Sequence, residues 1–243
     1  MKIRIQSDLH FEFLNDESLH QFIEKQIYYQ KINNADILIL AGDICTFNTT
    51  HYLITYLIQI SPLYKYVLYV LGNHEYYHGK SIDVEEKFKN ICSKFDNVKL
   101  LLNEEFIYDN IYFFGSTLWT PIDKLAYKQM NDKRFLSYEE IIAKHKICKE
   151  KCIEFLKRDE YKILITHHLP CKVFINEIYK GSEINSGFSA DCDEFFHYDI
   201  KYWIYGHTHM PLIKEYKGCK TICVPYGYPG ENKNDFYDNF FEI

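Results

Sequence analysis

The chain has 243 residues, 47% of them hydrophobic and 26% charged, with a formal net charge of −6. This length suits a single domain, residues 1–243, and no stretch approaches the roughly 18 apolar residues that a membrane-spanning helix needs. Long nucleic acid is an improbable partner, because phosphate contacts demand clustered cations and the lysines here are scattered among 34 acids. With no apolar leader and no CxxC pair among the eight cysteines, we expect a cytoplasmic protein with reduced thiols. Composition leaves the oligomeric state open.

Five predicted strands run directly into polar side chains of the kinds that bind metal ions. In chain order, they are residues 2–7 before Asp8 and His10, 36–40 before Asp43, 66–71 before Asn73 and His74, 162–166 before His167 and His168, and 202–205 before His207 and His209. Their nearly continuous apolar sequences are typical of strands buried on both faces, as in parallel sheets.

The segments between these strands predict helices and further strands. Apolar residues at helical spacing follow the first two strands, and Ser137 with Glu140 forms a capping box before a longer helix. Residues 98–119 are typical of an antiparallel meander, and residues 214–224 are again rich in β-formers. The alternation of strand and helix favours an α/β domain with two sheets.

The polar strand ends predict one metal centre. Ligands gather at the carboxyl ends of strands in α/β folds, so the five ends should converge. Residues i and i+2 of an extended segment point to the same side, which allows Asp8 with His10, and His207 with His209, to act as pairs. Together the strand ends supply more ligands than one ion needs, and two ions sharing a carboxylate fit better. The expected ligands are Asp8, His10, Asp43, Asn73, His167, His207 and His209.

This ligand set also limits the chemistry. Imidazole, carboxylate and amide oxygen without thiolate suit Mn, Fe, Zn or Mg and do not select among them. Two divalent ions outweigh the two carboxylate charges, so the centre should attract an anion. Two metals about 3.5–4 Å apart activate a water for attack on phosphorus and stabilise both the attacking and the leaving oxygen. We expect the attacking group to be a hydroxide that bridges the two metals.

The segments SDLH, LAGD, LGNHE, THH and YGHTH, in this order over residues 6–209, resemble the motif blocks of the calcineurin-like metallophosphoesterases. The resemblance implies a four-layer α/β/β/α sandwich with two mixed β-sheets. It also implies that Asp43 bridges the two ions and that His74 stabilises the transferring phosphoryl group or protonates the leaving oxygen. The first ion would then be bound by Asp8, His10, Asp43 and His209, and the second by Asp43, Asn73, His167 and His207.

Further segments, among them SDLHFEF, MNDKRF and GYPGE, are similar to a compact bacterial-type branch of that family. In that branch an acid and an arginine of the middle segment lie near the active site, which makes Asp132 and Arg134 expected substrate contacts. His168 either lines the pocket or packs beneath it. The chain departs from the branch at Val224 and Pro225, where an Asn-Pro pair is expected, so no role is carried over to that position.

We therefore expect a metal-dependent phosphoric ester hydrolase acting on a small, phosphomonoester or phosphodiester substrate, with a nucleotide-like compound as one possibility. A phosphoprotein phosphatase and a non-catalytic scaffold of the same fold are the alternatives. A scaffold should have lost a ligand or the catalytic histidine, and none is missing from the sequence.

Overall fold

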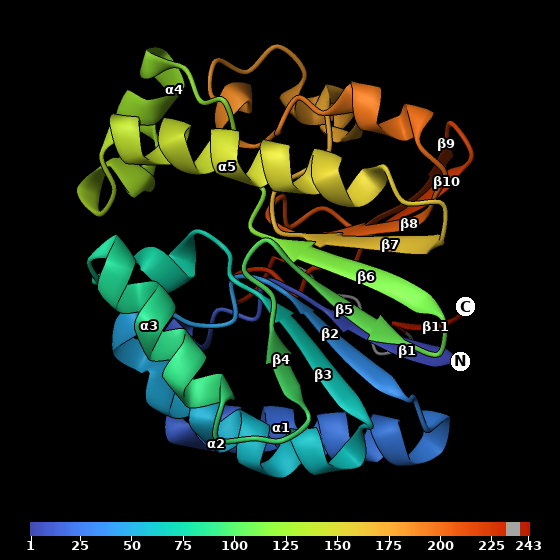
Figure 1. Ribbon diagram of the computed structural model, residues 1–243. Helices are drawn as coiled ribbons and strands as arrows, with labels where there is room; N and C mark the ends of the chain where they lie inside the picture. Colours follow the sequence, from blue (N-terminus) through green and yellow to red (C-terminus); the bar gives the residue numbers. More distant parts are fainter. Residues whose placement is uncertain (232–238) are drawn as a thin grey trace.

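The computed structural model of the chain describes residues 1–231 and 239–243. Two mixed β-sheets lie face to face with helices on their outer surfaces (Figure 1). The first sheet has the strand order β11-β1-β2-β3-β4, and the second has the order β5-β6-β7-β8-β10-β9. The helices α1, α2 and α3 cover the first sheet, and α5 covers the second (Figure 1). The four-layer α/β/β/α arrangement expected from the sequence is confirmed.

The strands are β1 (Lys2–Gln6), β2 (Ile37–Ala41), β3 (Tyr66–Val70), β4 (Val98–Leu100), β5 (Glu104–Tyr108), β6 (Ile111–Ser116), β7 (Tyr161–Thr166), β8 (Ile200–Tyr205), β9 (Leu212–Tyr216), β10 (Cys219–Cys223) and β11 (Phe240–Glu242). The α-helices are α1 (Asp16–Asn33), α2 (Thr50–Ile60), α3 (Ser81–Cys92), α4 (Lys124–Gln129) and α5 (Tyr138–Leu156). None of the helices in the described part of the chain is long and apolar enough to span a bilayer.

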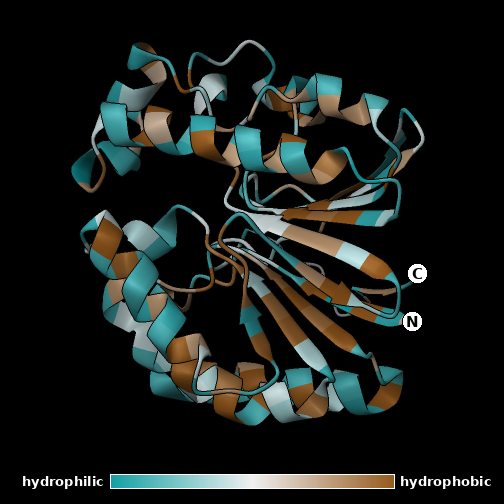
Figure 2. Ribbon diagram, in the orientation of Figure 1, coloured by the Kyte–Doolittle hydropathy of each residue, from teal (hydrophilic) through white to brown (hydrophobic). Residues whose placement is uncertain are grey.

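The central strands are apolar on both faces because each face packs against a different layer. In β2, Ile37 and Ile39 belong to a core that the two sheets share, whereas Leu38 and Leu40 belong to the core beneath the helices. Figure 2 shows that the strands are largely hydrophobic and that the helices carry both hydrophilic and hydrophobic residues. This double burial explains why the strand sequences are continuously apolar rather than alternating.

Helix α5 begins at the capping box that the sequence predicts, and α1 begins at a capping box that we did not predict. The side chain of Asn15 accepts the N–H of Ser18 at the start of α1, and that of Ser137 accepts the N–H of Glu140 at the start of α5. These capping bonds satisfy backbone donors that a helix terminus leaves unpaired. They define where each of the two helices begins.

The meander expected over residues 98–119 is only partly correct. β5 and β6 form an antiparallel hairpin, but β4 pairs in parallel with β3 at the edge of the other sheet. The chain therefore crosses between the sheets after Leu100. A three-residue strand carries too short a pattern to show which neighbour it joins.

The topology places the polar strand ends together. β1, β2 and β3 are mutually parallel, as are β7 and β8, so their carboxyl ends lie along one edge of each sheet. The two edges meet where His167 Nδ1, just after β7, lies 2.9 Å from the carbonyl of Ala41, the last residue of β2. This edge is where the site forms.

Candidate metal centre

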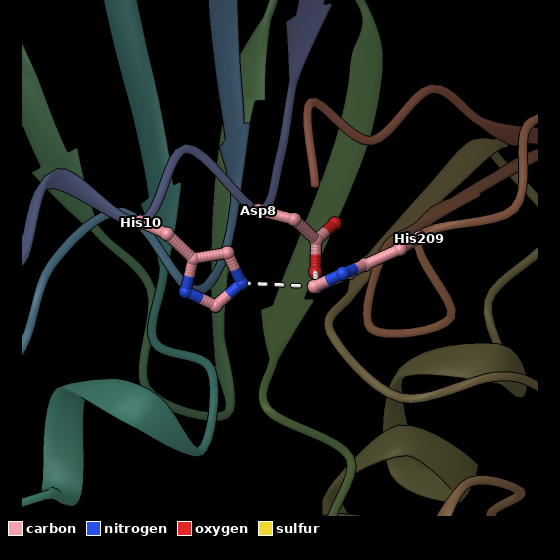
Figure 3. Close-up of side chains that lie close together, drawn as sticks. All are labelled: Asp8, His10 and His209. Atoms are coloured by element: carbon pink, nitrogen blue, oxygen red, sulfur yellow. Dashed lines mark hydrogen bonds and ion pairs between the residues drawn. The ribbon is translucent and has the colours of Figure 1, made fainter. Parts of the chain in front are cut away.

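A first group of side chains brings together residues that are about 200 positions apart in the sequence. Asp8 and His10 follow β1, and His209 follows β8 (Figure 3). His10 Nε2 lies 2.9 Å from His209 Nε2, and His209 Nε2 lies 3.5 Å from Asp8 Oδ1. The three ligand atoms are close enough to hold one metal ion.

A second group lies beside the first. His167 Nε2 is 3.3 Å from Asp43 Oδ2, 3.1 Å from Asn73 Oδ1 and 3.2 Å from His207 Nδ1. These four side chains come from the ends of β2, β3, β7 and β8. Asp43, His167 and His207 are also compact enough to hold an ion. The structure thus brings all seven expected ligands into one cluster.

Asp43 stands between the two groups. Its Oδ2 lies 3.9 Å from His10 Nε2 and 3.3 Å from His167 Nε2. Its Oδ1 accepts the backbone N–H of His74 at 2.8 Å. One carboxylate oxygen therefore faces an imidazole of each group, while the other is used to hold the carboxylate in place.

The paired residues meet through left-handed backbone rather than the extended geometry that we expected. Asp8, His10, Asp43, His207 and His209 have φ angles of 55°, 48°, 55°, 72° and 51°. Such conformations are strained for residues other than glycine and persist where surrounding bonds hold them. Two of these bonds are Asp8 N–H to the Gly42 carbonyl at 2.9 Å and His207 N–H to Asp8 Oδ1 at 2.8 Å. The strand ends are tied to one another through the backbone as well as the side chains.

The site is electrostatically demanding because its carboxylates are buried. Burial alone raises the pKa of Asp43, but the His167 and His74 imidazoles outweigh it and hold that pKa well below its usual range. Burial lowers the pKa of His167, yet Asp43 more than offsets this and raises it to about 9. Burial, with neighbouring imidazoles, holds the pKa of His207 well below its usual range. Ionised carboxylates paired with imidazoles are groups for which protons and metal cations compete.

One buried polar atom fits metal ligation. Asp8 Oδ2 is buried and has no hydrogen-bond partner within residues 1–231 and 239–243. Buried polar atoms are normally paired or coordinate a metal. The donors of the cluster are imidazole nitrogens, carboxylate oxygens and one amide oxygen, a set that suits divalent transition metals. The residues present therefore fit a metal centre.

His74 lies at the edge of the cluster. Its Nε2 is 4.0 Å from Asp43 Oδ2 and 3.3 Å from the Tyr228 hydroxyl, and its Nδ1 is 2.8 Å from Glu12 Oε1. Burial lowers the pKa of His74, and the Asp43 and Glu12 carboxylates more than compensate, so that it is raised. The ligand atoms of His10, Asp43 and His74 also lie close enough together to hold an ion.

Glu75 supports the site, a role that we did not predict although it ends the LGNHE segment. Its carboxylate accepts the N–H groups of Asp43 at 3.0 Å and Gly72 at 2.7 Å, together with the Tyr69 hydroxyl at 2.7 Å. Burial, aided by Asp43, raises the pKa of Glu75 to about 7. Glu75 thus connects the backbone after β2 with the backbone after β3.

Asp132 reaches the cluster through Tyr77. The Tyr77 hydroxyl accepts Asn73 Nδ2–H at 3.1 Å and donates to Asp132 Oδ2 at 3.2 Å. This chain turns the Asn73 amide so that its oxygen faces His167. Asp132 is buried, and its contact with the site is made through Tyr77.

The structure does not bring Arg134 into the cluster. Its side chain is exposed, and its Cζ lies 5.7 Å from the centre of the Phe135 ring. His168 is buried, with Nδ1 3.0 Å from the Thr117 carbonyl and its ring 4.3 Å from that of His207. Of its two expected roles, this geometry matches packing against a ligand.

The segment at Val224 and Pro225 supports the end of β1. Pro225 forms a bridge with Ser7, and the N–H groups of Tyr226 and Gly227 donate to the carbonyls of Ser7 and Asp8, both at 2.9 Å. Next in the chain, Tyr228 lies against His10 and His209, with ring centres 4.5 Å apart in both pairs. The segment therefore holds the backbone at Asp8 and covers one side of His10 and His209 with an aromatic ring.

Comparison with known proteins identifies the family of the chain. The profile of the calcineurin-like phosphoesterases matches residues 1–211. The chain belongs to this family. The calcineurin-like phosphoesterase is 30% identical to the uncharacterized protein L509 of Acanthamoeba polyphaga mimivirus, over 96% of this chain and 93% of that protein. The present chain is therefore a metal-dependent phosphoester hydrolase, as the sequence predicted.

Solved structures share its fold. The phosphopantetheinyl hydrolase of Mycobacterium tuberculosis superposes with a TM-score of 0.74 at 18% identity, over 97% of this chain and 94% of that one. A dimetal phosphatase from Danio rerio superposes with a TM-score of 0.53 at 13% identity, over 92% and 86% of the two chains. At these identities the likeness is one of fold.

Proposed function

We propose that residues 1–243 form a single phosphoesterase domain that works with two divalent metal ions. The position of Asp43 carries the proposal, because one of its oxygens faces imidazoles of both ligand groups. Its carboxylate would be shared by the two ions. The remaining ligands would be Asp8, His10 and His209 for one ion, and Asn73, His167 and His207 for the other.

The side chains around the centre have separate tasks in this proposal. Bound there, two divalent ions would activate a water for attack on phosphorus and neutralise charge on the phosphoryl oxygens. Tyr77 orients the Asn73 amide through its hydroxyl. His74, whose Nε2 is directed toward the cluster, hydrogen-bonds the phosphoryl group or protonates the departing oxygen.

The substrate proposed is a small phosphodiester or phosphomonoester. An acidic chain with scattered lysines offers little for long nucleic acid. The ligand set suits Mn, Fe, Zn or Mg, and manganese is the ion with which we would reconstitute it. All eight cysteines are buried free thiols, which favours action in a reducing compartment such as the cytoplasm.

A non-catalytic scaffold would need fewer of these features. The seven ligands and His74 are all present, and their ligand atoms lie close together in one cluster. The related folds include one protein described as a hydrolase and one described as a dimetal phosphatase. Both observations favour an enzyme.

The test is hydrolysis by protein reconstituted with Mn²⁺, assayed with bis(p-nitrophenyl) phosphate and with p-nitrophenyl phosphate. A diesterase releases p-nitrophenol faster from the first substrate and a monoesterase faster from the second. Activity should disappear with a chelator and return with Mn²⁺. A folded, metal-bound protein that cleaves neither substrate would favour the scaffold.

A further inference from the structure

We infer that Glu12 is a positioning residue that fixes the ring orientation of both His10 and His74. The inference rests on the proposed metal centre and adds to it a side chain that links a ligand with the histidine beside the centre. Glu12 lies in the 3-10 turn Phe11–Phe13, directly after His10. Neither its position nor its partners follow from the ligand motifs alone.

One oxygen of Glu12 contacts both rings. Its Oε1 lies 2.9 Å from His10 Nδ1 and 2.8 Å from His74 Nδ1. The side chain is only 12% exposed. A carboxylate oxygen this close to two ring nitrogens accepts a hydrogen bond from each of them. Both Nδ1 atoms must therefore carry the hydrogen.

Fixing the hydrogen on Nδ1 leaves Nε2 to face the centre on both rings. His10 Nε2 lies 2.9 Å from His209 Nε2 and 3.9 Å from Asp43 Oδ2, while His74 Nε2 lies 4.0 Å from the same Asp43 oxygen. The ring centres of His10 and His74 are 4.5 Å apart. A histidine that ligates through one nitrogen commonly donates its other N–H to a carboxylate, which fixes the tautomer. Here one carboxylate does so for two rings.

The arrangement differs from an ordinary histidine–glutamate pair. Both bonds that Glu12 makes to the histidines run through Oε1, while Oε2 is buried and has no partner in the described part of the chain. On the surface of α1, Glu24 lies 3.3 Å from His20, with both side chains mostly exposed. That pair provides a matched control.

The first experiment reads the tautomers directly. Imidazole ¹⁵N–¹H spectra of the metal-free wild-type protein should show His10 and His74 with the hydrogen on Nδ1. In Glu12→Ala both rings should become mixtures of tautomers, and Glu12→Gln, which keeps an acceptor oxygen, should restore them in part. Wild-type rings with the hydrogen on Nε2 would overturn the inference without any variant.

The second experiment measures function. Calorimetric titration should show Mn²⁺ affinity 10- to 100-fold weaker in Glu12→Ala, the usual effect of removing such a partner. At saturating Mn²⁺ its kcat should fall at least tenfold while KM changes less. In a His74→Ala background, the same change should have little further effect on kcat. Glu24→Gln should match the wild type in every measurement.

These outcomes separate the two claims. Unchanged tautomers and Mn²⁺ affinity in Glu12→Ala would refute the positioning role even if the wild-type enzyme is active. A wild-type protein that hydrolyses no phosphate ester would refute the proposed function, while the spectra and the titration would still decide the role of Glu12.

Discussion

Gly72 lies so close to Asp43 that a side chain at this position must displace the carboxylate. A Cβ there would lie 2.1 Å from Asp43 Oδ1, 2.6 Å from the Asp43 backbone nitrogen and 2.8 Å from His167 Cε1. Ordinary contacts begin at 3.4 Å, so Gly72→Ala requires a shift of about 1.3 Å at the carboxylate. The smallest possible side chain should therefore disturb the centre.

A displacement of this size should act on binding and turnover together. Misplacing a catalytic group by about 1 Å can cost roughly 10²-fold in rate. We expect Gly72→Ala to lower kcat/KM for bis(p-nitrophenyl) phosphate about 100-fold and to weaken Mn²⁺ binding, measured by steady-state kinetics and calorimetry. Because Asp43 faces both ligand groups, the affinity of both bound ions should fall.

Gly115→Ala is the matched control because it introduces similar crowding between the sheets. Its Cβ would lie 2.3 Å from Leu101 Cβ and 2.8 Å from Val70 Cγ1. Overpacking of this kind typically costs about 1–3 kcal/mol of stability. This variant should melt at a lower temperature yet bind Mn²⁺ normally while folded. Wild-type Mn²⁺ affinity and kcat/KM in Gly72→Ala would refute the reasoning.

Substitutions at three further residues test individual roles. Asp43→Asn should weaken both Mn²⁺ ions by more than ~10-fold, since even partners of ligands contribute that much; calorimetry showing one ion unaffected would remove its shared role. His74→Ala should lower kcat roughly 10²–10⁴-fold while metal content, measured by elemental analysis, stays near normal; loss of an ion would make His74 a ligand. Arg134→Ala should raise KM for a phosphodiester roughly tenfold with a smaller effect on kcat, and Arg134→Lys should recover it only in part. Unchanged KM in both would leave Arg134, which is exposed in the structure, without a substrate role.

The ligand cluster could be predicted because its signal is local. Each ligand follows a buried strand within four residues, and parallel topology brings such ends together. The sequence spacing of Asp8 with His10, and of His207 with His209, predicted paired ligands. The extended backbone that we predicted for these pairs was wrong. Their φ angles are left-handed, and such angles depend on bonds to other strand ends.

The supporting residues could not be predicted because their contacts span long sequence separations. Glu12 and His74 are 62 residues apart in the sequence. Tyr228, whose hydroxyl contacts His74, is separated from it by 154 residues. No periodic pattern relates such positions. The same reason applies to β11, whose three residues pair with β1 from the other end of the chain.

Asp132 and Arg134 show how little sequence proximity says about a site. Both lie in the turn Asn131–Arg134, yet Asp132 is buried against Tyr77 while Arg134 faces solvent. Successive residues of a 3-10 helix point about 120° apart, so residues in one turn need not share an environment. A resemblance that named the segment could not tell which side chain turns inward.

The central claim is that two ions, sharing Asp43, are needed for phosphate-ester hydrolysis. Its most direct test is to titrate metal-free protein with Mn²⁺ while measuring bound ion and bis(p-nitrophenyl) phosphate hydrolysis in the same samples. The account predicts that activity rises with occupancy and reaches its plateau at two bound ions per chain. A plateau at one ion, or no hydrolysis with two ions bound, would contradict it.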